Sequence, residues 1–345
     1  AEMLKPGGKA VYTEAKLAPN PDLPEPDSGL SSIRTADFNG DGIIDYAYAG
    51  DMQGNVWRFD LLKTGATSPF TAEASASDFK VSFGGKKPLY TAKETAAGTS
   101  KRQPITTAPA LVRHPSGVGY LVIFGTGRYL GSTDKSSLDM QTIYGVWDRK
   151  TAGESTNTTP DLDRSNLQVQ TMTSASFEGK TVRMISQNTI DWYGNGTGTS
   201  DSNVSTWGWY LDLKAGTSNS STRGERVIYN MAVYGEGLIF STVTPEPNSC
   251  AAGLTGFTYG INPTTGGRTL YNVFDMNGDG KVDADDSLAG EVISGHETPA
   301  GGAVISDGLQ YHTDGSTVAI AGGGNASGRQ TWRLIPANQS NKAGE

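Results

Sequence analysis

The sequence has one cysteine, few charged residues and no long apolar run. Cys250 has no second cysteine to pair with, so it is either a buried thiol or the partner of a cysteine in a segment outside this sequence. Only 19% of the 345 residues are charged, and stretches of Ala, Leu, Glu and Lys at helical spacing are nearly absent. No run of about 18 apolar residues occurs, so we expect no transmembrane helix.

Signals for export, nucleic-acid binding and catalysis are also missing. Residues 1–9 lack the apolar segment of a signal peptide, as expected for a mature fragment or a processed chain. The net charge of -8 argues against a nucleic-acid partner. The three histidines (His114, His296 and His312) have no zinc-site spacing, the cysteine has no neighbouring histidine, and no nucleophile-elbow motif occurs. We therefore expect a protein that is not an enzyme.

Glycine is abundant, at 45 residues, and Ser, Thr and Asn are frequent. Short apolar segments alternate with polar stretches, a pattern that predicts many short β-strands joined by long loops. The predicted strands lie at residues 46–49, 120–125, 227–233, 238–243 and 317–321. The chain is therefore expected to be all-β, as one large domain or two smaller ones.

A strand with an aromatic residue near its end, often followed by Asp, recurs along the chain. The aromatic residues of this repeat are Trp57, Trp147, Tyr210, Tyr259 and Trp332. Such a repeat favours a β-propeller of small antiparallel sheets, with polar insertions at 72–102, 150–165 and 193–205. The alternative is an irregular pair of β-sandwiches, because the repeat is loose.

We predict that residues 1–345 form part of one β-propeller domain. Residues 9–14 have the pattern of a strand whose earlier partners are absent from the sequence. The chain is therefore expected to be the C-terminal part of a larger propeller.

Two acidic loops share the template D-x-N-x-D-G-x-x-D, at residues 37–45 and 275–286. In such loops the side chains at positions 1, 3 and 5 and the carbonyl at position 7 surround a hard cation, and Gly at position 6 permits the sharp turn. The spacing predicts two calcium sites. The alternative, an Asp/Gly turn without metal, is disfavoured because the template occurs twice.

The template assigns the ligands residue by residue. In the first loop they are Asp37, Asn39, Asp41, the carbonyl of Ile43 and Asp45 at position 9. Position 12 is Tyr48, so the usual bidentate carboxylate is missing there. In the second loop they are Asp275, Asn277, Asp279, the carbonyl of Lys281, Asp283 and, at position 12, Asp286. Asp285 is expected to face outward, and residues 284–288 to form a turn of helix.

The first loop runs directly into Tyr46-Ala47-Tyr48-Ala49-Gly50-Asp51-Met52-Gln53-Gly54-Asn55-Val56-Trp57-Arg58-Phe59-Asp60. This stretch resembles the hallmark of the PilY/PilC family, the tip-located adhesins and assembly factors of bacterial type IV pili. Residues 124–130, 207–213 and 328–333 fit the same family. The resemblance implies a modified β-propeller that forms the C-terminal domain of a longer secreted protein. It also implies that residues 37–45 bind calcium and help to control pilus extension and retraction; the second loop matches only some relatives.

The resemblance further implies a role in pilus biogenesis, twitching motility, adhesion and surface sensing. Implied partners are minor pilins and other pilus-tip proteins, the N-terminal remainder of the same protein, and a host or abiotic surface. The implied location is extracellular, at the bacterial surface or pilus tip (the fimbrium), after export through the periplasm. Two alternatives remain open: a quinoprotein-like dehydrogenase propeller, and an integrin-like propeller that binds a protein ligand through its loops.

Overall fold

The chain folds almost entirely into β-strands. The computed structural model describes residues 29–63, 66, 69–70, 72–83, 87–96, 99–149, 161–193, 204–214, 224–245, 255–299, 304–306, 308–312 and 316–321. Within these ranges no α-helix occurs, and the helical elements are three 3-10 turns, Ser132–Lys135, Arg164–Asn166 and Ala284–Asp286. None of the helices in this part of the chain has the length and apolar character needed to cross a membrane.

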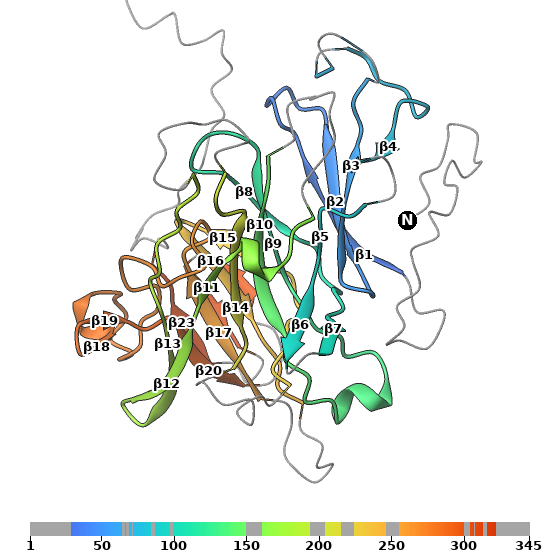
Figure 1. The fold of residues 1–345 in the computed structure, drawn as a ribbon. Coiled ribbons are helices and arrows are strands. Elements are labelled where there is room, and N and C mark those ends of the chain that lie inside the picture. The colour runs from blue at the N-terminus through green and yellow to red at the C-terminus, as the bar shows by residue number, and fades with distance from the viewer. Residues whose placement is uncertain are drawn as a thin grey trace, which may run out of the picture.

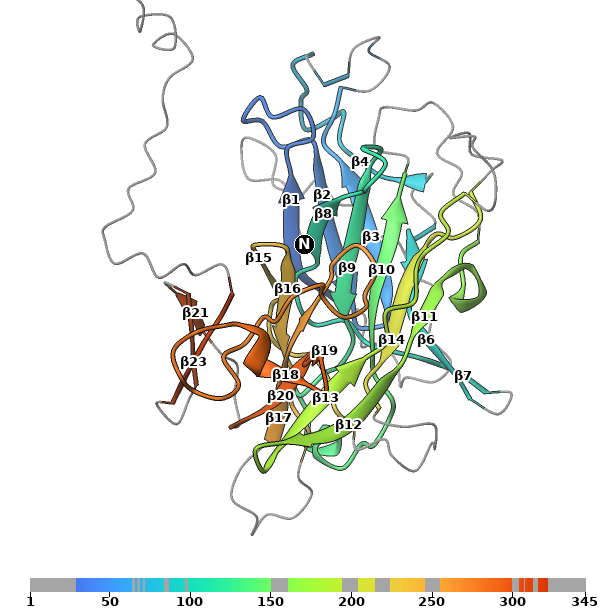
Figure 2. The ribbon, with the colours of Figure 1, turned by 90° about the vertical axis from the view of Figure 1, so that its left-hand side faces the viewer.

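Three main sheets lie side by side in space (Figures 1 and 2). The first contains β1 (Leu30–Ala36), β2 (Tyr46–Asp51), β3 (Asn55–Asp60) and β4 (Lys80–Val81), with β5 (Tyr90–Thr91) also paired to β3. The second has the order β11 (Gln168–Gln170), β14 (Gly208–Asp212), β10 (Thr142–Asp148), β9 (Tyr120–Gly125) and β8 (Ala110–Arg113).

The third sheet has six strands, in the order β12 (Met172–Phe177), β13 (Lys180–Ile185), β20 (Gly295–Pro299), β17 (Thr255–Ile261), β16 (Gly237–Ser241) and β15 (Ala232–Tyr234). Smaller sheets pair β6 (Lys93–Ala96) with β7 (Thr99–Arg102), β18 (Ser287–Leu288) with β19 (Glu291–Val292), and β22 (Leu309–Tyr311) with both β21 (Val304–Ser306) and β23 (Thr317–Ala319). Adjacent strands are antiparallel, except that β11 runs parallel to β14.

The hydrophobic core lies between successive sheets. Every residue of β2, β3, β9 and β10 is buried, so both faces of these strands are covered. One cluster joins the first sheet to the second, with Tyr48 and Val56 packed against Val122 and Phe124. Another joins the second sheet to the third, through residues such as Trp209 and Tyr259. Burial of apolar side chains between sheets is the packing expected of neighbouring propeller blades.

The predictions of strands are confirmed in part. Residues 120–125 form β9, and β2 and β16 contain most of the predicted segments at 46–49 and 238–243. The strand predicted at 227–233 is wrong over most of its length, since regular pairing covers only Ala232–Tyr234. Val227 is completely buried, and its N–H donates to the carbonyl of Thr126 from outside any strand. A buried apolar run in a connecting segment has the same sequence signal as a strand.

The repeated aromatic residues do not each mark a separate sheet. Trp147 lies on β10 and Tyr210 on β14, and these two strands pair within one sheet. The chain leaves this sheet after β11, forms β12 and β13 of the third sheet, and returns at β14, so two copies of the pattern belong to one blade. The strand predicted at residues 9–14, Cys250 and Trp332 lie outside the described residues.

Candidate metal centre

The first acidic loop connects β1 to β2 and is held by its own side chains. The Asp37 carboxylate accepts backbone N–H groups from Gly40 at 2.6 Å and from Gly42 at 2.7 Å. Asn39 accepts the N–H of Asp41 at 3.2 Å, and Asp41 accepts that of Ile43 at 2.7 Å. Gly40 and Gly42 have φ angles of 79° and 90°, a region that glycine occupies without strain.

The second acidic loop, between Phe274 and β18, repeats these bonds position by position. The carboxylate of Asp275 accepts the N–H groups of Gly278 at 2.7 Å and Gly280 at 2.9 Å. Asn277 accepts the N–H of Asp279 at 3.0 Å, and Asp279 accepts that of Lys281 at 2.8 Å. Two loops far apart in the sequence therefore adopt one hydrogen-bond pattern, because they share one template.

Each loop is closed by a buried carboxylate that accepts the N–H of position 2. In the first loop Asp45 accepts from Phe38 at 2.6 Å, and in the second Asp286 accepts from Met276 at 2.6 Å. Asp45 is 2% exposed and Asp286 1%. By its place in the template, position 9, Asp45 corresponds instead to Asp283. Asp283, however, is exposed and caps the 3-10 turn by accepting the N–H of Asp285 at 3.0 Å.

The structure therefore corrects the correspondence between the two loops at position 12 of the template. Tyr48 stands at position 12 but is completely buried on β2 and donates to Asp148 at 2.8 Å, away from the loop. Asp45 closes the short loop in the way that Asp286 closes the long one. The predicted turn of helix at 284–288 is a 3-10 turn over Ala284–Asp286 that is followed at once by β18, and Asp285 is exposed as predicted.

The apolar residue at position 2 fastens each loop to the core. The Phe38 ring stacks on Phe70 with centroids 5.2 Å apart, and Met276 is buried in a cluster of the third sheet. The first loop also contacts the second sheet. The Arg113 guanidinium lies 4.3 Å from the Phe38 ring centroid, and the Tyr120 hydroxyl donates to the Asp37 carbonyl at 3.2 Å. The first loop therefore bridges two sheets.

The surroundings shift the pKa values of two carboxylates of the first loop in opposite directions. Burial raises the pKa of Asp45, and the neighbouring charges of Asp37 and Asp41 add to that rise. The N–H groups of Gly42 and Gly40 hold the pKa of Asp37 below its ordinary value. Repulsion among adjacent carboxylates is the condition that a bound cation relieves.

The donor set suits calcium, although the described residues do not bring three His, Cys, Asp or Glu side chains together as a metal-binding group. A carboxylate has about four lone-pair positions, so one that accepts backbone N–H groups keeps capacity for a cation. Calcium takes six to eight oxygen ligands in flexible geometry, including amide and carbonyl oxygens. The residues therefore fit calcium, provided that the carboxylates move inward around the ion.

The histidines make ring contacts in and beside the aromatic core. His114 stacks on Trp147 with ring centroids 3.7 Å apart, and His296 meets Phe274 edge-on at 4.8 Å. His296 and His312 have ring centroids 5.8 Å apart. A cavity of about 460 Å³ beside β5 and β6 includes no residue of either acidic loop in its lining.

Comparison with known proteins shows which class of domain this fold belongs to. A family model described as "PilY1 beta-propeller domain" matches residues 24–182. The crystal structure of the Pseudomonas aeruginosa PilY1 C-terminal domain is 40% identical and superposes with a TM-score of 0.71, over 88% of this chain and 60% of that one. The protein is therefore a β-propeller of the kind found in PilY1, which confirms the predicted fold class.

The sequence relatives complete the assignment. The type IV pilus biogenesis factor PilY1 of Pseudomonas aeruginosa is 42% identical over 331 residues, covering 89% of this chain and 28% of that protein. A PilY1 homolog of Xylella fastidiosa is 31% identical, covering 89% of this chain and 22% of the homolog. This chain belongs to the PilY1 family. It spans between a fifth and a third of the length of these two relatives.

Proposed function

We propose that this domain is a non-enzymatic, calcium-binding β-propeller of a protein associated with the tip of the type IV pilus. The observation that carries the proposal is the hydrogen-bond pattern shared by the two acidic loops, each closed by a buried carboxylate. The name of the relatives, type IV pilus biogenesis factor, supports the pilus association.

Calcium would be held by the oxygen atoms that the template predicts. In the first loop these belong to Asp37, Asn39, Asp41, the carbonyl of Ile43 and Asp45. In the second they belong to Asp275, Asn277, Asp279, the carbonyl of Lys281, Asp283 and Asp286. Asp283 is the weakest member of this set, because it is exposed and already caps a turn.

The first site would act through the contact between sheets. The loop leads directly into β2 and touches the second sheet through Arg113 and Tyr120. An ion that draws Asp37, Asp41 and Asp45 together would therefore fix both the entry of β2 into its sheet and the position of that sheet against its neighbour. We infer that calcium shapes a face that contacts minor pilins or other tip proteins.

The biological consequence would be calcium-dependent pilus assembly, extension and retraction, and through them twitching motility and surface adhesion. The protein would act outside the cell at the pilus tip, joined to the remainder of its own chain and facing a host or abiotic surface. Extracellular modules bind calcium with dissociation constants of about 10⁻⁴ to 10⁻³ M, close to its concentration outside cells.

Calorimetric titration of the metal-stripped protein tests the proposal. Two calcium sites are expected, with Asp41→Ala removing one and Asp279→Ala the other. The same Asp41→Ala change, introduced into the chromosome of the source bacterium, should reduce twitching while the protein is still exported. Absence of calcium binding at both loops would refute the proposed sites.

A further inference from the structure

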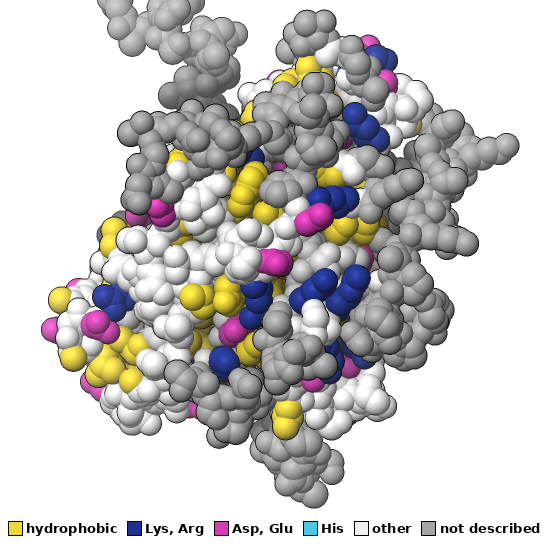
Figure 3. All heavy atoms as spheres, viewed as in Figure 1, with side chains coloured by type: hydrophobic (Ala, Val, Ile, Leu, Met, Phe, Trp, Pro, Cys, Tyr) yellow, Lys and Arg dark blue, Asp and Glu magenta, His cyan; other side chains and the backbone are white. Residues whose placement is uncertain are grey.

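A second candidate site lies away from both acidic loops, in a cavity of about 330 Å³ between the β6–β7 hairpin and the segment that joins β9 to β10. On the face shown in Figure 3, Lys and Arg side chains gather over the place that β6 and β7 occupy in Figure 1. Four cationic residues and three carboxylates line the cavity: Lys101, Arg102, Arg128 and Arg226, with Glu94, Asp134 and Asp139. In a chain of net charge -8 this is a local excess of positive charge.

The segment between β9 and β10 is held rigidly in place by one buried arginine. Arg226 is 2% exposed and donates to the carbonyls of Arg128 at 2.9 Å, Asp134 at 3.1 Å and Ser137 at 2.6 Å. A fourth bond reaches the carbonyl of Gly224 at 2.8 Å. A surface segment fixed at three carbonyls can present side chains without losing further conformational freedom on binding.

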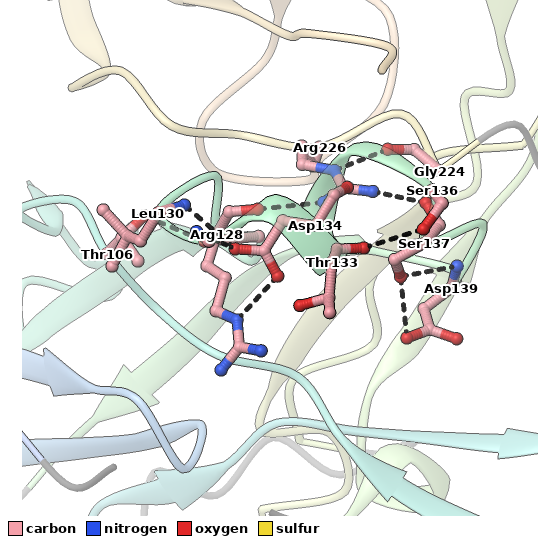
Figure 4. A network of polar contacts seen from close by, with 12 residues as sticks. Thr106, Arg128, Leu130, Thr133, Asp134, Ser136, Ser137, Asp139, Gly224 and Arg226 are labelled. Carbon is pink, nitrogen blue, oxygen red and sulfur yellow. Dashed lines mark hydrogen bonds and ion pairs between the residues drawn. The ribbon is translucent and has the colours of Figure 1, made fainter. Parts of the chain in front are cut away.

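Asp134 then orients Arg128. Its carboxylate is 5% exposed, accepts the N–H groups of Leu130 and Gly131 at 2.9 Å each, and accepts the Arg128 Nε–H at 2.9 Å. Figure 4 shows the Arg128 guanidinium turned away from the segment, with only Nε engaged. Among the described residues, the two terminal amino groups of Arg128 have no hydrogen-bond partner. A guanidinium held from behind in this way offers the paired donors that bind a carboxylate in bidentate geometry.

Gln141, which lines the same cavity, has a side-chain acceptor that lacks a donor. Gln141 is 5% exposed, and its Oε1 has no hydrogen-bond partner among the described residues. A buried acceptor without a partner costs about 1 to 3 kcal/mol, which a ligand N–H group would recover. The cavity therefore offers the Arg128 guanidinium for an anionic group and the Gln141 oxygen for an N–H donor. A peptide with an acidic side chain has both a carboxylate and N–H groups.

The other charged side chains that line the cavity leave it with a net attraction for the carboxylate of a ligand. Asp134 is occupied by Arg128, and Asp139 pairs with Lys101 at 2.6 Å. Among the residues that the structure describes, the Arg102 side chain makes only a long contact of 3.4 Å to the side chain of Asn55. Glu94 also lines the cavity and opposes an incoming anion. Arg102 and Arg226 line it too, and neither has a carboxylate within ion-pair distance among the described residues.

We propose that this cavity binds an acidic peptide segment of a partner protein, with the carboxylate on Arg128 and a peptide N–H on Gln141. The site shares no residue with either acidic loop, so it does not rest on the calcium proposal. Leu130 and Leu138 lie on the same segment outside the lining of the cavity and are 75% and 55% exposed. We take them as the apolar surface for a side chain next to the acidic one.

Binding of capped dipeptides, followed by NMR on the isotope-labelled domain, tests this site. N-acetyl-Glu-Leu-amide should bind, and N-acetyl-Gln-Leu-amide should bind about tenfold more weakly because it lacks the charged acceptor. Arg128→Gln should weaken the Glu probe by about tenfold, and Arg128→Lys should not restore it, since lysine lacks the fork. Arg268→Gln is the matched control, because Arg268 pairs with Glu291 at 2.9 Å outside the cavity.

Further arms separate a peptide site from a simple anion site and from misfolding. Gln141→Leu should weaken the Glu probe and leave the binding of inorganic phosphate unchanged. The proposal is overturned if Arg128→Gln, with an unchanged melting temperature, still binds the Glu probe fully. It is also overturned if both dipeptides bind equally, or if phosphate binds through Arg128 and the dipeptides do not compete with it.

Discussion

The guanidinium of Arg58 on β3 lies 2.8 Å from the carboxylate of Asp148 on β10, and both side chains are at most 1% exposed. This ion pair joins the first sheet to the second inside their shared core. Tyr48 donates to the same carboxylate at 2.8 Å, and Arg58 also donates to Asp60 and Ser82. The pair is thus fully hydrogen-bonded, which is the condition for ions buried between two sheets.

We predict that Asp148→Asn lowers the free energy of unfolding by about 1 to 3 kcal/mol, because Arg58 loses the charge-assisted hydrogen bonds to one of its two buried carboxylates and keeps only Asp60. Glu291→Gln is the control, since Glu291 is 56% exposed in its pair with Arg268 and should change stability by less than about 1 kcal/mol. Urea unfolding of both variants measures the difference. Equal effects would mean that the buried pair is not a principal contact between the sheets.

A second prediction tests which carboxylate closes the first acidic loop. Asp45→Asn should abolish calcium binding at that loop or weaken it by at least about tenfold, because it removes the charge of the closing ligand. Tyr48→Phe changes the residue at position 12 and should leave calcium affinity unchanged, although it removes a buried hydrogen bond. Calorimetry on the metal-stripped proteins distinguishes the two. Loss of calcium affinity in Tyr48→Phe would show that the residue at position 12 contributes to the site after all.

The second loop provides the complementary comparison. Asp286→Asn should remove its calcium site, whereas Asp283→Asn should weaken it much less, because Asp283 is exposed and Asp286 is 1% exposed. The same titration measures both variants, with the first loop as an internal reference. A larger loss in Asp283→Asn would contradict the assignment of Asp286 as the closing ligand.

A third prediction concerns Trp209, which packs against two glycines. A Cβ atom placed on Gly145 or on Gly266 would overlap the indole ring, and Gly266 also has a φ of 69°. Gly145→Ala should therefore cost about 1 to 3 kcal/mol through overpacking, and Gly266→Ala should cost more because backbone strain is added. Gly237→Ala is the control, since its Cβ would have no heavy atom nearer than 3.6 Å. Thermal unfolding gives the order of the three variants.

Stability should also fall on mild acidification. Burial lowers the pKa of both His114 and His296 from 6.5 to about 4, and Arg149 adds to the effect on His114. The unfolded chain therefore binds more protons below pH 6.5, so each histidine's contribution is complete above that value and is lost as the pH falls toward 4. The slope reaches about 1.4 kcal/mol per pH unit for each histidine.

Urea unfolding at several pH values between 7.5 and 4.5 measures this slope. His114→Phe keeps an aromatic ring against Trp147 and should flatten the curve, as should His296→Gln. Because other groups titrate in the same range, the informative quantity is the difference in slope between each variant and the parent protein. No difference would show that these histidines keep ordinary pKa values in the folded protein.

The sequence by itself determined the local structure of the acidic loops. The bonds among the first seven positions of each loop join residues only two to five positions apart, as from Gly42 to Asp37 or from Lys281 to Asp279. Such short-range contacts follow from the order of Asp, Asn and Gly alone. The all-β class and strands such as β9 were predictable for the same reason, since a short apolar run bounded by turn residues is a local signal.

Only the tertiary structure decided which groups meet across the sheets. The bond from Arg58 to Asp148 spans 90 residues, and that from Arg226 to the carbonyl of Arg128 spans 98. The role of Asp45 depends on its burial beside β2, and the two aromatic residues of the second sheet share a blade only because the chain returns to it. The order of residues in the sequence does not show which side chains become buried when the sheets pack together. That burial decides which charged groups must form ion pairs.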